Sequence, residues 1–378
     1  MSDDFDKCIT FDSLYAGLKA SCRGVRWKDS VIRYENNALK NTHNLKKDIE
    51  NGKYQIQKYQ TFEIFEPKRR VIVATRIRDR QFQHSLVDNC VYKELTRHFV
   101  ADNCACQLGR GVDYCLDRMT KHLRRYYTEN RQSNEGFFLK CDIEDYFGSI
   151  DHEIASQMLR KYIKDPEVQK ELDRIIASYN GDHGLGLGSQ CNQLFALALL
   201  NGLDHFIKEK LKVKFYIRYM DDFILIHSDK EYLKYCKKEI EDYLKRLRLR
   251  LNQKKTTIQP IRHGIRLLKW RFILTETGRI IRKMDRRKVA KQKRKITKLY
   301  AMEENGKVAP GTCDQSMMSF MANAERGDSF KERRKVALYY SELTGGKKHY
   351  HDYVKRRTAV AEAGSDCSEQ SDSTKHHD

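Results

Sequence analysis

The most apolar segments in the middle of the chain have the length and the flanks of β-strands. Residues 136–141 (GFFLKC) form a short apolar run that ends at Asp142. Residues 215–227 (FYIRYMDDFILIH) are apolar on both sides of a polar pair, Asp221 and Asp222. We therefore expect one strand before Asp142 and a hairpin that turns at the Asp pair.

The segments between and after these strands have the apolar spacing of α-helices. Two helices are expected after Asp151, divided by Pro166. The Gly-rich turn at 181–190 (GDHGLGLGSQ) precedes a third helix with the apolar stretch LFALALL. A fourth helix carries apolar residues at spacings of 3, 4, 4 and 3, the pattern of a helix that faces a sheet. These residues are Leu233, Cys236, Ile240, Leu244 and Leu247.

A last apolar segment at 265–274 is expected to be a strand, which completes the order β, α, α, β, β, α, β. This order predicts a compact α+β layer, an antiparallel sheet with helices on one face. Upstream, alternating and β-branched residues up to Thr75 predict a hairpin with Glu66 and Pro67 near its turn. A helix is expected from about Arg78.

The C-terminal part of the chain is expected to be helical and basic. Residues 281–300 contain ten Lys or Arg and a single acid, Asp285, in a helix-compatible stretch. Two shorter helical patterns follow at 315–324 and 330–343. The final polar stretch, AEAGSDCSEQSDSTKHHD, is almost free of apolar groups and is expected to be disordered.

The chain carries a large excess of positive charge. Its 378 residues include 73 Lys and Arg against 52 Asp and Glu, a formal net charge of +21. Nucleic acid is the expected partner, because each phosphate that a cation neutralises releases counterions. An anionic membrane surface is the weaker alternative. The longest apolar run, residues 194–200, is too short to cross a bilayer, and the N-terminus lacks the pattern of a secretion signal.

We therefore expect a cytoplasmic protein without a membrane partner. Eleven cysteines are scattered along the chain, and no two of them form a C-x-x-C pair. In such a protein this pattern predicts free thiols rather than disulfides or a structural zinc site.

Asp142, Asp221 and Asp222 are the residues best suited to carry chemistry. Taken alone, Asp221 and Asp222 are equally consistent with a turn that has no further role, since Asp is a common turn residue. Asp142 also ends an apolar strand, and adjacent strands would bring it beside the turn. Three clustered carboxylates repel one another unless a divalent cation holds them, and oxygen ligands favour Mg²⁺. Two such ions about 3.5 to 4 Å apart promote phosphoryl transfer.

Five motifs follow one another along the chain: KCDIEDYFGSIDH, LGSQCNQLFA, YMDD, LNQKKTTI and LLKWRF. In this order they resemble the bacterial reverse transcriptases related to group II intron enzymes. PKRRVIVATRIRDRQFQ with CACQLGRG is similar to their finger region. The resemblance implies a right-hand polymerase fold, with fingers at 1–135 and a palm at 136–280 that carries the YMDD hairpin. It further implies a helical basic thumb at 281–360, before the disordered tail at 361–378.

The resemblance also implies a metal site and a triphosphate site. Two Mg²⁺ ions, or Mn²⁺ in their place, would be bound by the catalytic residues Asp142, Asp221 and Asp222 and by the main-chain carbonyl of Ile143. Arg70, helped by Lys68, would grip the incoming triphosphate; the alternative for KRR is a solvated basic turn. Lys255 would protonate the departing pyrophosphate, or else it is a solvated lysine that follows a strand.

Phe147 matches the aromatic residue that excludes ribonucleotides in this family. A ring under the sugar leaves no room for a 2′-hydroxyl, so deoxynucleotides would be preferred. The alternative is a core aromatic next to Tyr146, and we expect these two side chains to point to opposite faces of an extended segment. In LGSQCNQ, which ends at Gln193 in the substrate site, Leu187 stands where many relatives have Gln. Loss of that amide would loosen base selection.

The sequence thus predicts an RNA-directed DNA polymerase that synthesises cDNA from an RNA template, such as a cognate structured noncoding RNA. Its other partners would be a DNA primer or nascent cDNA and deoxynucleoside triphosphates. Antiphage defence is the expected setting, and a diversity-generating retroelement is the alternative. A catalytically idle RNA-binding or maturase-like protein is disfavoured by the intact Asp residues. An RNA-directed RNA polymerase is disfavoured by Phe147.

Overall fold

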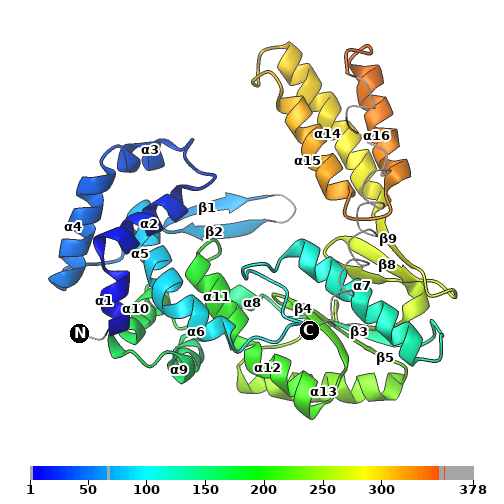
Figure 1. Cartoon of the computed structure of the whole chain (residues 1–378), viewed down its shortest axis with the longest axis horizontal. Helices are drawn as coiled ribbons and strands as arrows, with labels where there is room; N and C mark the ends of the chain where they lie inside the picture. The colour runs from blue at the N-terminus through cyan, green and yellow to red at the C-terminus, as the bar shows by residue number, and fades with distance from the viewer. Residues whose placement is uncertain (1–2, 66–68, 349–352, 354–378) are drawn as a thin grey trace, which may run out of the picture. The chain divides into compact units, whose positions relative to one another are not determined.

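The computed structural model describes residues 3–65, 69–348 and 353. Contacts divide the chain into two units, Met1–Arg262 and His263–Asp378, and each is described by itself (Figure 1). The predicted hairpin turn at Glu66 and Pro67 lies outside the described residues, as do Lys68 and the predicted disordered tail at 361–378.

The first unit contains a four-stranded antiparallel sheet. Its strand order is β4 (Phe215–Tyr219), β5 (Asp222–His227), β3 (Phe137–Asp142) and β6 (Thr257–Pro260). β3 and β5 pair along their whole length, and the last pair joins Asp142 and Asp222. The strand expected before Asp142 and the hairpin expected around the Asp pair are both confirmed.

One face of this sheet packs against α13 (Lys230–Arg246). The predicted apolar stripe is buried there, and four of its members are fully excluded from solvent: Leu233, Cys236, Ile240 and Leu244. Leu139 and Leu225 from the sheet belong to the same core. Since full burial of a Leu or Ile side chain contributes about 1.5–3 kcal/mol, this stripe fixes the helix on the sheet.

A helix that the sequence analysis did not anticipate, α7 (Val112–Glu129), packs against the edge strand β4. The ring of Phe215 meets His122 and Tyr126 edge-on, with centroid separations of 6.0 and 5.5 Å. Alternate residues of a strand point to opposite faces, so Phe215 faces away from the α13 side, where Tyr216 lies in the core. Helices therefore contact both faces of β4.

Helices make up much of the rest of the first unit (Figure 1). They are α1 (Asp3–Cys8), α2 (Phe11–Cys22), α3 (Asp29–Glu35), α4 (Ala38–Glu50), α5 (Ile77–Leu86), α6 (Tyr92–Thr96), α8 (Tyr146–Ser149), α9 (His152–Tyr162), α10 (Pro166–Ala177), α11 (Gln190–Leu199) and α12 (Asn201–His205). The division at Pro166 is confirmed: α10 begins there, and the Asp165 carboxylate caps it by accepting from two backbone amides. α2 and α5 touch at Gly17, where a Cβ would lie 2.3 Å from the Gln81 carbonyl oxygen.

The predicted N-terminal hairpin is present as β1 (Gln60–Ile64) and β2 (Arg70–Ala74). The two strands pair antiparallel, with Ile64 opposite Arg70. Arg70 is thus the first residue of β2, and its side chain is exposed. The neighbouring Arg69 forms an ion pair with Glu63, with Nη2 2.7 Å from Oε1.

The second unit joins a small sheet to helices. Its strands are β7 (Ile265–Leu267), β8 (Trp270–Leu274) and β9 (Ile280–Met284), and its helices are α14 (Arg286–Glu304), α15 (Thr312–Ala324) and α16 (Phe330–Leu343). The single strand expected at 265–274 is in fact a hairpin, which turns at Leu268 and Lys269. Both turn residues have positive φ, 50° and 68°, so Lys269 adopts a conformation that glycine favours.

The helix expected over 281–300 is wrong at its beginning. Residues up to Met284 belong to β9, and the helix starts only after Asp285, whose carboxylate accepts from the Arg287 amide. The three helices enclose an apolar core of their own, with Ile296, Met317 and Val336 fully buried. Residues 263–280, which the resemblance assigned to the palm, belong to this unit by their contacts.

The described cysteines are all free. Nine are buried and Cys106 is exposed. Over the described part of the chain, no helix combines the length and the apolar character that a membrane crossing requires.

Candidate active site

Asp142, Asp221 and Asp222 lie together at one end of the four-stranded sheet. Asp142 and Asp222 are register partners, which places their Cα atoms about 4.5–5.5 Å apart in an antiparallel pair. Tyr219 pairs with Asp222, so Met220 and Asp221 form the two-residue turn between β4 and β5. The structure therefore brings together the three acidic residues that the sequence singled out.

Two lysines form ion pairs with these carboxylates. Nζ of Lys255 lies 2.6 Å from Oδ2 of Asp142, and Nζ of Lys140 lies 2.9 Å from Oδ2 of Asp222. Among the described residues, no group of three or more His, Cys, Asp or Glu side chains has the arrangement of a metal site. In this arrangement two of the three carboxylates, those of Asp142 and Asp222, are each paired with a lysine ammonium group.

Lys140 is a residue of the site that sequence reasoning missed. It precedes Asp142 by two positions on β3, and residues two apart on a strand point to the same face. The position of Lys140, two residues before Asp142 on the same strand, could therefore have identified it as a residue of the site. Its side chain is about a quarter exposed, so the ion pair with Asp222 is screened less than one at the surface.

The electrostatics of the cluster are unfavourable for two free carboxylates. Burial raises the pKa of Asp221, the charge of Asp142 raises it further, and Lys255 and Arg70 lower it. Burial also raises the pKa of Asp222, against the lowering effect of Lys140. In both residues the protein disfavours the charged form, as expected where acids are crowded and partly desolvated.

One oxygen of the cluster is free to accept a ligand. Oδ1 of Asp222 is buried, and no group in the described part of the chain donates a hydrogen bond to it. Leaving a buried carboxylate oxygen unsatisfied is costly, and Mg²⁺ prefers ligands of this kind. Asp222 therefore offers one buried oxygen of the kind that the predicted divalent cation binds.

The backbone at Ile143 also fits a role as a metal ligand. Ile143 forms an isolated bridge with Leu251, flanked by two hydrogen bonds of its neighbours. The Glu144 amide donates to the Arg250 carbonyl at 2.9 Å, and the Asn252 amide donates to the Asp142 carbonyl at 2.8 Å. A residue flanked in this way directs its own carbonyl away from its bridge partner. The Ile143 carbonyl therefore points away from Leu251 and toward β5, where Asp222 lies.

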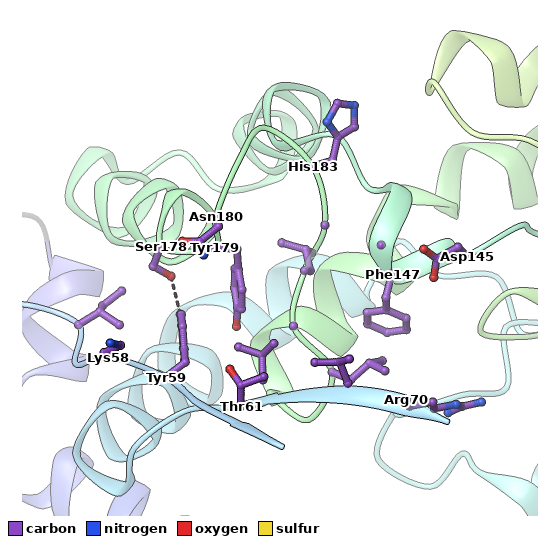
Figure 2. Close-up of a pocket in the computed structure, with 18 of the residues that line it drawn as sticks. Lys58, Tyr59, Thr61, Arg70, Asp145, Phe147, Ser178, Tyr179, Asn180 and His183 are labelled. Carbon is purple, nitrogen blue, oxygen red and sulfur yellow. Dashed lines mark hydrogen bonds between the residues drawn. The ribbon is translucent and has the colours of Figure 1, made fainter. Parts of the chain in front are cut away.

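A cavity of about 870 Å³ is lined by the β1–β2 hairpin, the segment after Asp142 and the Gly-rich loop between α10 and α11. Figure 2 shows Arg70 and Phe147 toward one end of this cavity, with Tyr59 and Tyr179 further along it. The charge of Arg70 also lowers the pKa of Asp221, so this end of the cavity is electrostatically coupled to the acidic cluster. Lys68, the expected helper of Arg70, lies outside the described residues.

Phe147 lines the cavity, but it does not lie on an extended segment as expected. Residues 146–149 form the helical turn α8 rather than an extended segment, because Asp145 adopts a left-handed φ of 39° and turns the chain. Tyr146 is buried at 3% exposure and donates to the Ala196 carbonyl. Its ring contacts Phe147 edge-on, with centroids 5.8 Å apart. Tyr146 is the core aromatic of this pair, and Phe147 faces the open space.

The Gly-rich loop places Leu187 in the same cavity. Asn192 holds this loop, since its Nδ2 donates to the Gly186 carbonyl and to the Tyr179 hydroxyl, each at 2.7 Å. At Gly186 a Cβ would lie 2.5 Å from the Tyr179 ring, so only glycine fits. The Tyr179 ring stacks on Tyr59 with centroids 4.9 Å apart and planes 8° apart.

Gln193 stands apart from this arrangement. It lies in the first turn of α11, half-buried, with its backbone amide bonded to the Ser189 carbonyl at 3.2 Å. It is not one of the described residues that line the cavity. The sequence motif therefore contributes to the cavity through Leu187 and, indirectly, through Asn192.

The fold and the acidic cluster define a right-hand nucleic-acid polymerase. Residues 56–272, more than half of the chain, match the family described as reverse transcriptase (RNA-dependent DNA polymerase). The chain belongs to this family. No curated protein sequence matches it.

Solved telomerase structures are among the structural matches of this chain. The apo telomerase of Candida tropicalis matches with a TM-score of 0.50 at 12% identity, over 81% of this chain and 62% of that one. A telomerase of Candida albicans with a fragment of telomeric RNA matches with a TM-score of 0.49 at 11% identity, over 77% of this chain and 55% of that one. This chain thus spans less than two thirds of the telomerase chains that it matches.

Proposed function

We propose that this protein is an RNA-directed DNA polymerase, which extends a DNA primer with deoxynucleotides on an RNA template. The proposal rests on the meeting of Asp142, Asp221 and Asp222 at one end of the sheet, where a buried oxygen of Asp222 lacks a donor among the described residues. Membership of the reverse transcriptase family supports the same reaction.

The three carboxylates and the Ile143 carbonyl would hold two Mg²⁺ ions. When bound, such ions activate the primer hydroxyl and stabilise the leaving pyrophosphate. Lys140 holds Asp222 in place by the ion pair across the strands β3 and β5. Asp142 and Asp222 keep their positions because they lie on paired strands, and Asp221 lies in the two-residue turn that joins β4 to β5.

The cavity residues would bind the incoming nucleotide. The Arg70 guanidinium donates charge-assisted hydrogen bonds to the triphosphate. Phe147 lies under the sugar and excludes a 2′-hydroxyl. Lys255, whose Nζ lies at the acidic cluster, gives a proton to the departing pyrophosphate.

The helix α14 would bind the template and primer backbones. It carries most of the basic run of residues 281–300 and reads no base, because lysine and arginine contacts to phosphates position a duplex without specifying its sequence. Nucleic acid is a suitable partner for a chain with a net charge of +21.

We further infer that the enzyme is of the bacterial type related to group II introns and works with a structured noncoding RNA in antiphage defence. The five ordered motifs support this type. Sequencing the RNA that copurifies with the protein, together with any DNA made from it, tests the inference. A single structured RNA with matching cDNA is expected. A diversifying role would give cDNA with many mismatches to its template instead.

Extension of a labelled primer on an RNA template tests the proposed reaction. The wild type should add deoxynucleotides in the presence of Mg²⁺, and Asp221→Ala should abolish addition while RNA binding stays within a few fold. Binding without extension by the wild type would instead identify an idle RNA-binding protein. Addition of ribonucleotides only would identify an RNA polymerase.

A further inference from the structure

A fully buried ion pair lies directly behind the catalytic turn. Arg218 of β4 and Asp204 of α12 are both 0% exposed. The pair is bidentate, with Nε 2.6 Å from Oδ1 and Nη2 2.5 Å from Oδ2. The Tyr216 hydroxyl also donates to Oδ1 of Asp204 at 2.6 Å. The Asp204 carboxylate is thus held by three donors.

The remaining donors of Arg218 reach main-chain carbonyls. Nη1 donates to the Met220 carbonyl at 3.0 Å, and Nη2 donates to the Leu197 carbonyl at 3.2 Å. Met220 has a φ of 58°, and a residue other than glycine persists in that conformation only where its surroundings hold it. Its carbonyl belongs to the same peptide plane as the Asp221 amide. A hydrogen bond that fixes the Met220 carbonyl therefore also fixes the orientation of the Asp221 backbone amide.

The backbone of Arg218 is anchored as well. Its amide donates to the Asp102 carbonyl and its carbonyl accepts from the Cys104 amide, each at 2.9 Å. This segment lies outside the sheet and bridges to β4 at Asn103. The backbone of Arg218 is therefore held by the segment at Asp102 and Cys104, and its side chain is held by Asp204.

Stability alone gives no reason for a charged pair at this place. Replacing a buried ion pair with apolar residues of similar volume is often neutral or stabilising. An apolar side chain at 218, however, has no donor for the Met220 carbonyl. Burial by itself would lower the pKa of Arg218, but Asp204 raises it above its ordinary value, so the guanidinium keeps all of its donors.

We propose that Arg218, held by Asp204, is a positioning residue that sets the conformation of the Met220–Asp221 turn and thereby the geometry of the catalytic carboxylates. This inference rests on the proposed polymerase function. It assigns the buried pair to the alignment of the site rather than to nucleotide binding. Loss of the pair should therefore lower kcat and weaken metal binding, and leave the KM for deoxynucleotides almost unchanged.

The test compares the double variant Arg218→Met/Asp204→Leu with the wild type and with Arg174→Met. The control breaks the ion pair with Glu171, whose side chain is 8% exposed, on a helix that does not contribute to the turn. The melting temperature, RNA affinity, Mn²⁺ affinity by electron paramagnetic resonance, and single-nucleotide kcat and KM are measured for each protein.

The double variant should keep its fold and its RNA affinity, lose roughly 10²-fold in kcat and bind Mn²⁺ more weakly. The control should keep wild-type kcat and Mn²⁺ affinity. A folded double variant with wild-type kcat would overturn the proposal.

If the double variant does not fold, Arg218→Lys decides the question. A lysine keeps the charge opposite Asp204 but cannot reproduce the planar fork that joins Asp204 and Met220. An unchanged kcat in that variant would also overturn the proposal. Failure of the wild type to extend any primer would instead refute the proposed function, and the Mn²⁺ affinities would still decide whether the pair shapes the acidic cluster.

Discussion

Lys255 and Asp142 form an ion pair at the centre of the candidate active site, with Nζ of the lysine 2.6 Å from Oδ2 of the acid. The lysine comes from the turn that precedes β6, and the acid is the last residue of β3. The side chain of Lys255 is about half exposed, so it is free to turn from the carboxylate toward a departing group. This geometry is compatible with both interpretations of Lys255, a solvated lysine and a proton donor.

Replacing Lys255 by Ala should lower kcat by about 10²–10⁴-fold, the usual contribution of a positioned general acid, with little change in the KM for deoxynucleotides. Pre-steady-state incorporation of one nucleotide measures both quantities. Lys254→Ala, at the adjacent exposed position of the same turn, is the matched control and should keep the wild-type rate. Equal rates for both variants would contradict the role of Lys255 as a proton donor and would leave it only the neutralisation of Asp142.

Replacing Asp221 by Asn should stabilise the protein at neutral pH without added metal. The folded-state pKa of Asp221 is raised by burial, so the folded protein holds its proton more tightly than the unfolded chain. Stability from this group is present below the unfolded pKa of about 3.9 and is lost as the pH rises through the folded pKa. The variant should therefore melt at a higher temperature than the wild type at pH 7 and at a similar temperature at pH 4.

Thermal melts with and without Mg²⁺ complete this test. Mg²⁺ should raise the melting temperature of the wild type and have little effect on Asp221→Asn, and a change of about 1 kcal/mol corresponds to a shift of a few degrees. Glu144→Gln, at an exposed position beside Asp142, should respond to Mg²⁺ like the wild type. An equal Mg²⁺ response in Asp221→Asn would contradict the assignment of Asp221 as a ligand.

Replacing Phe147 by Ala should admit ribonucleotides. The Phe147 ring lines the cavity near Arg70, and its loss would open space beside the sugar of a bound nucleotide. The ratio of kcat/KM for a deoxynucleotide to that for its ribonucleotide should fall by roughly tenfold or more. Phe147→Tyr keeps a ring and should keep the ratio. Unchanged discrimination in the Ala variant would remove the steric role.

Binding of an RNA–DNA duplex should weaken log-linearly with salt concentration. Counterions would leave the phosphates that α14 is proposed to neutralise, and each lost contact should lower the magnitude of the slope by about 0.7–0.9. The double variant Lys295→Gln/Lys298→Gln, at two exposed positions of α14, should show a shallower slope than Lys331→Gln on α16. Identical slopes for the two proteins would place the duplex elsewhere.

The sequence predicted the fold best where a regular spacing of apolar residues marks the buried face of a helix or strand. The stripe from Leu233 to Leu244 identified α13, and the apolar flanks of Asp221 and Asp222 identified the hairpin that carries them. The proximity of Asp142 followed from the order of strands alone. These features depend on side-chain periodicity and on pairing between neighbouring strands, which are both visible in a single sequence.

The parts that escaped prediction depend on local backbone conformation or on distant partners. Asp145 turns the chain into α8, and no periodicity in DIEDYF indicates its left-handed φ. Residues 281–284 pair with β8 although their charge suggested a helix, because pairing rather than composition decides their conformation. Arg218 finds Asp204 on another element, which no spacing rule reveals.

The most direct test of the account is the position of Mn²⁺ in crystals of the protein with an RNA–DNA primer-template and a non-hydrolysable deoxynucleotide. Anomalous scattering should show two ions about 3.5–4 Å apart, bound by Asp142, Asp221, Asp222 and the Ile143 carbonyl. Manganese peaks elsewhere, with Lys140 and Lys255 still paired to Asp222 and Asp142 beside the bound nucleotide, would contradict it.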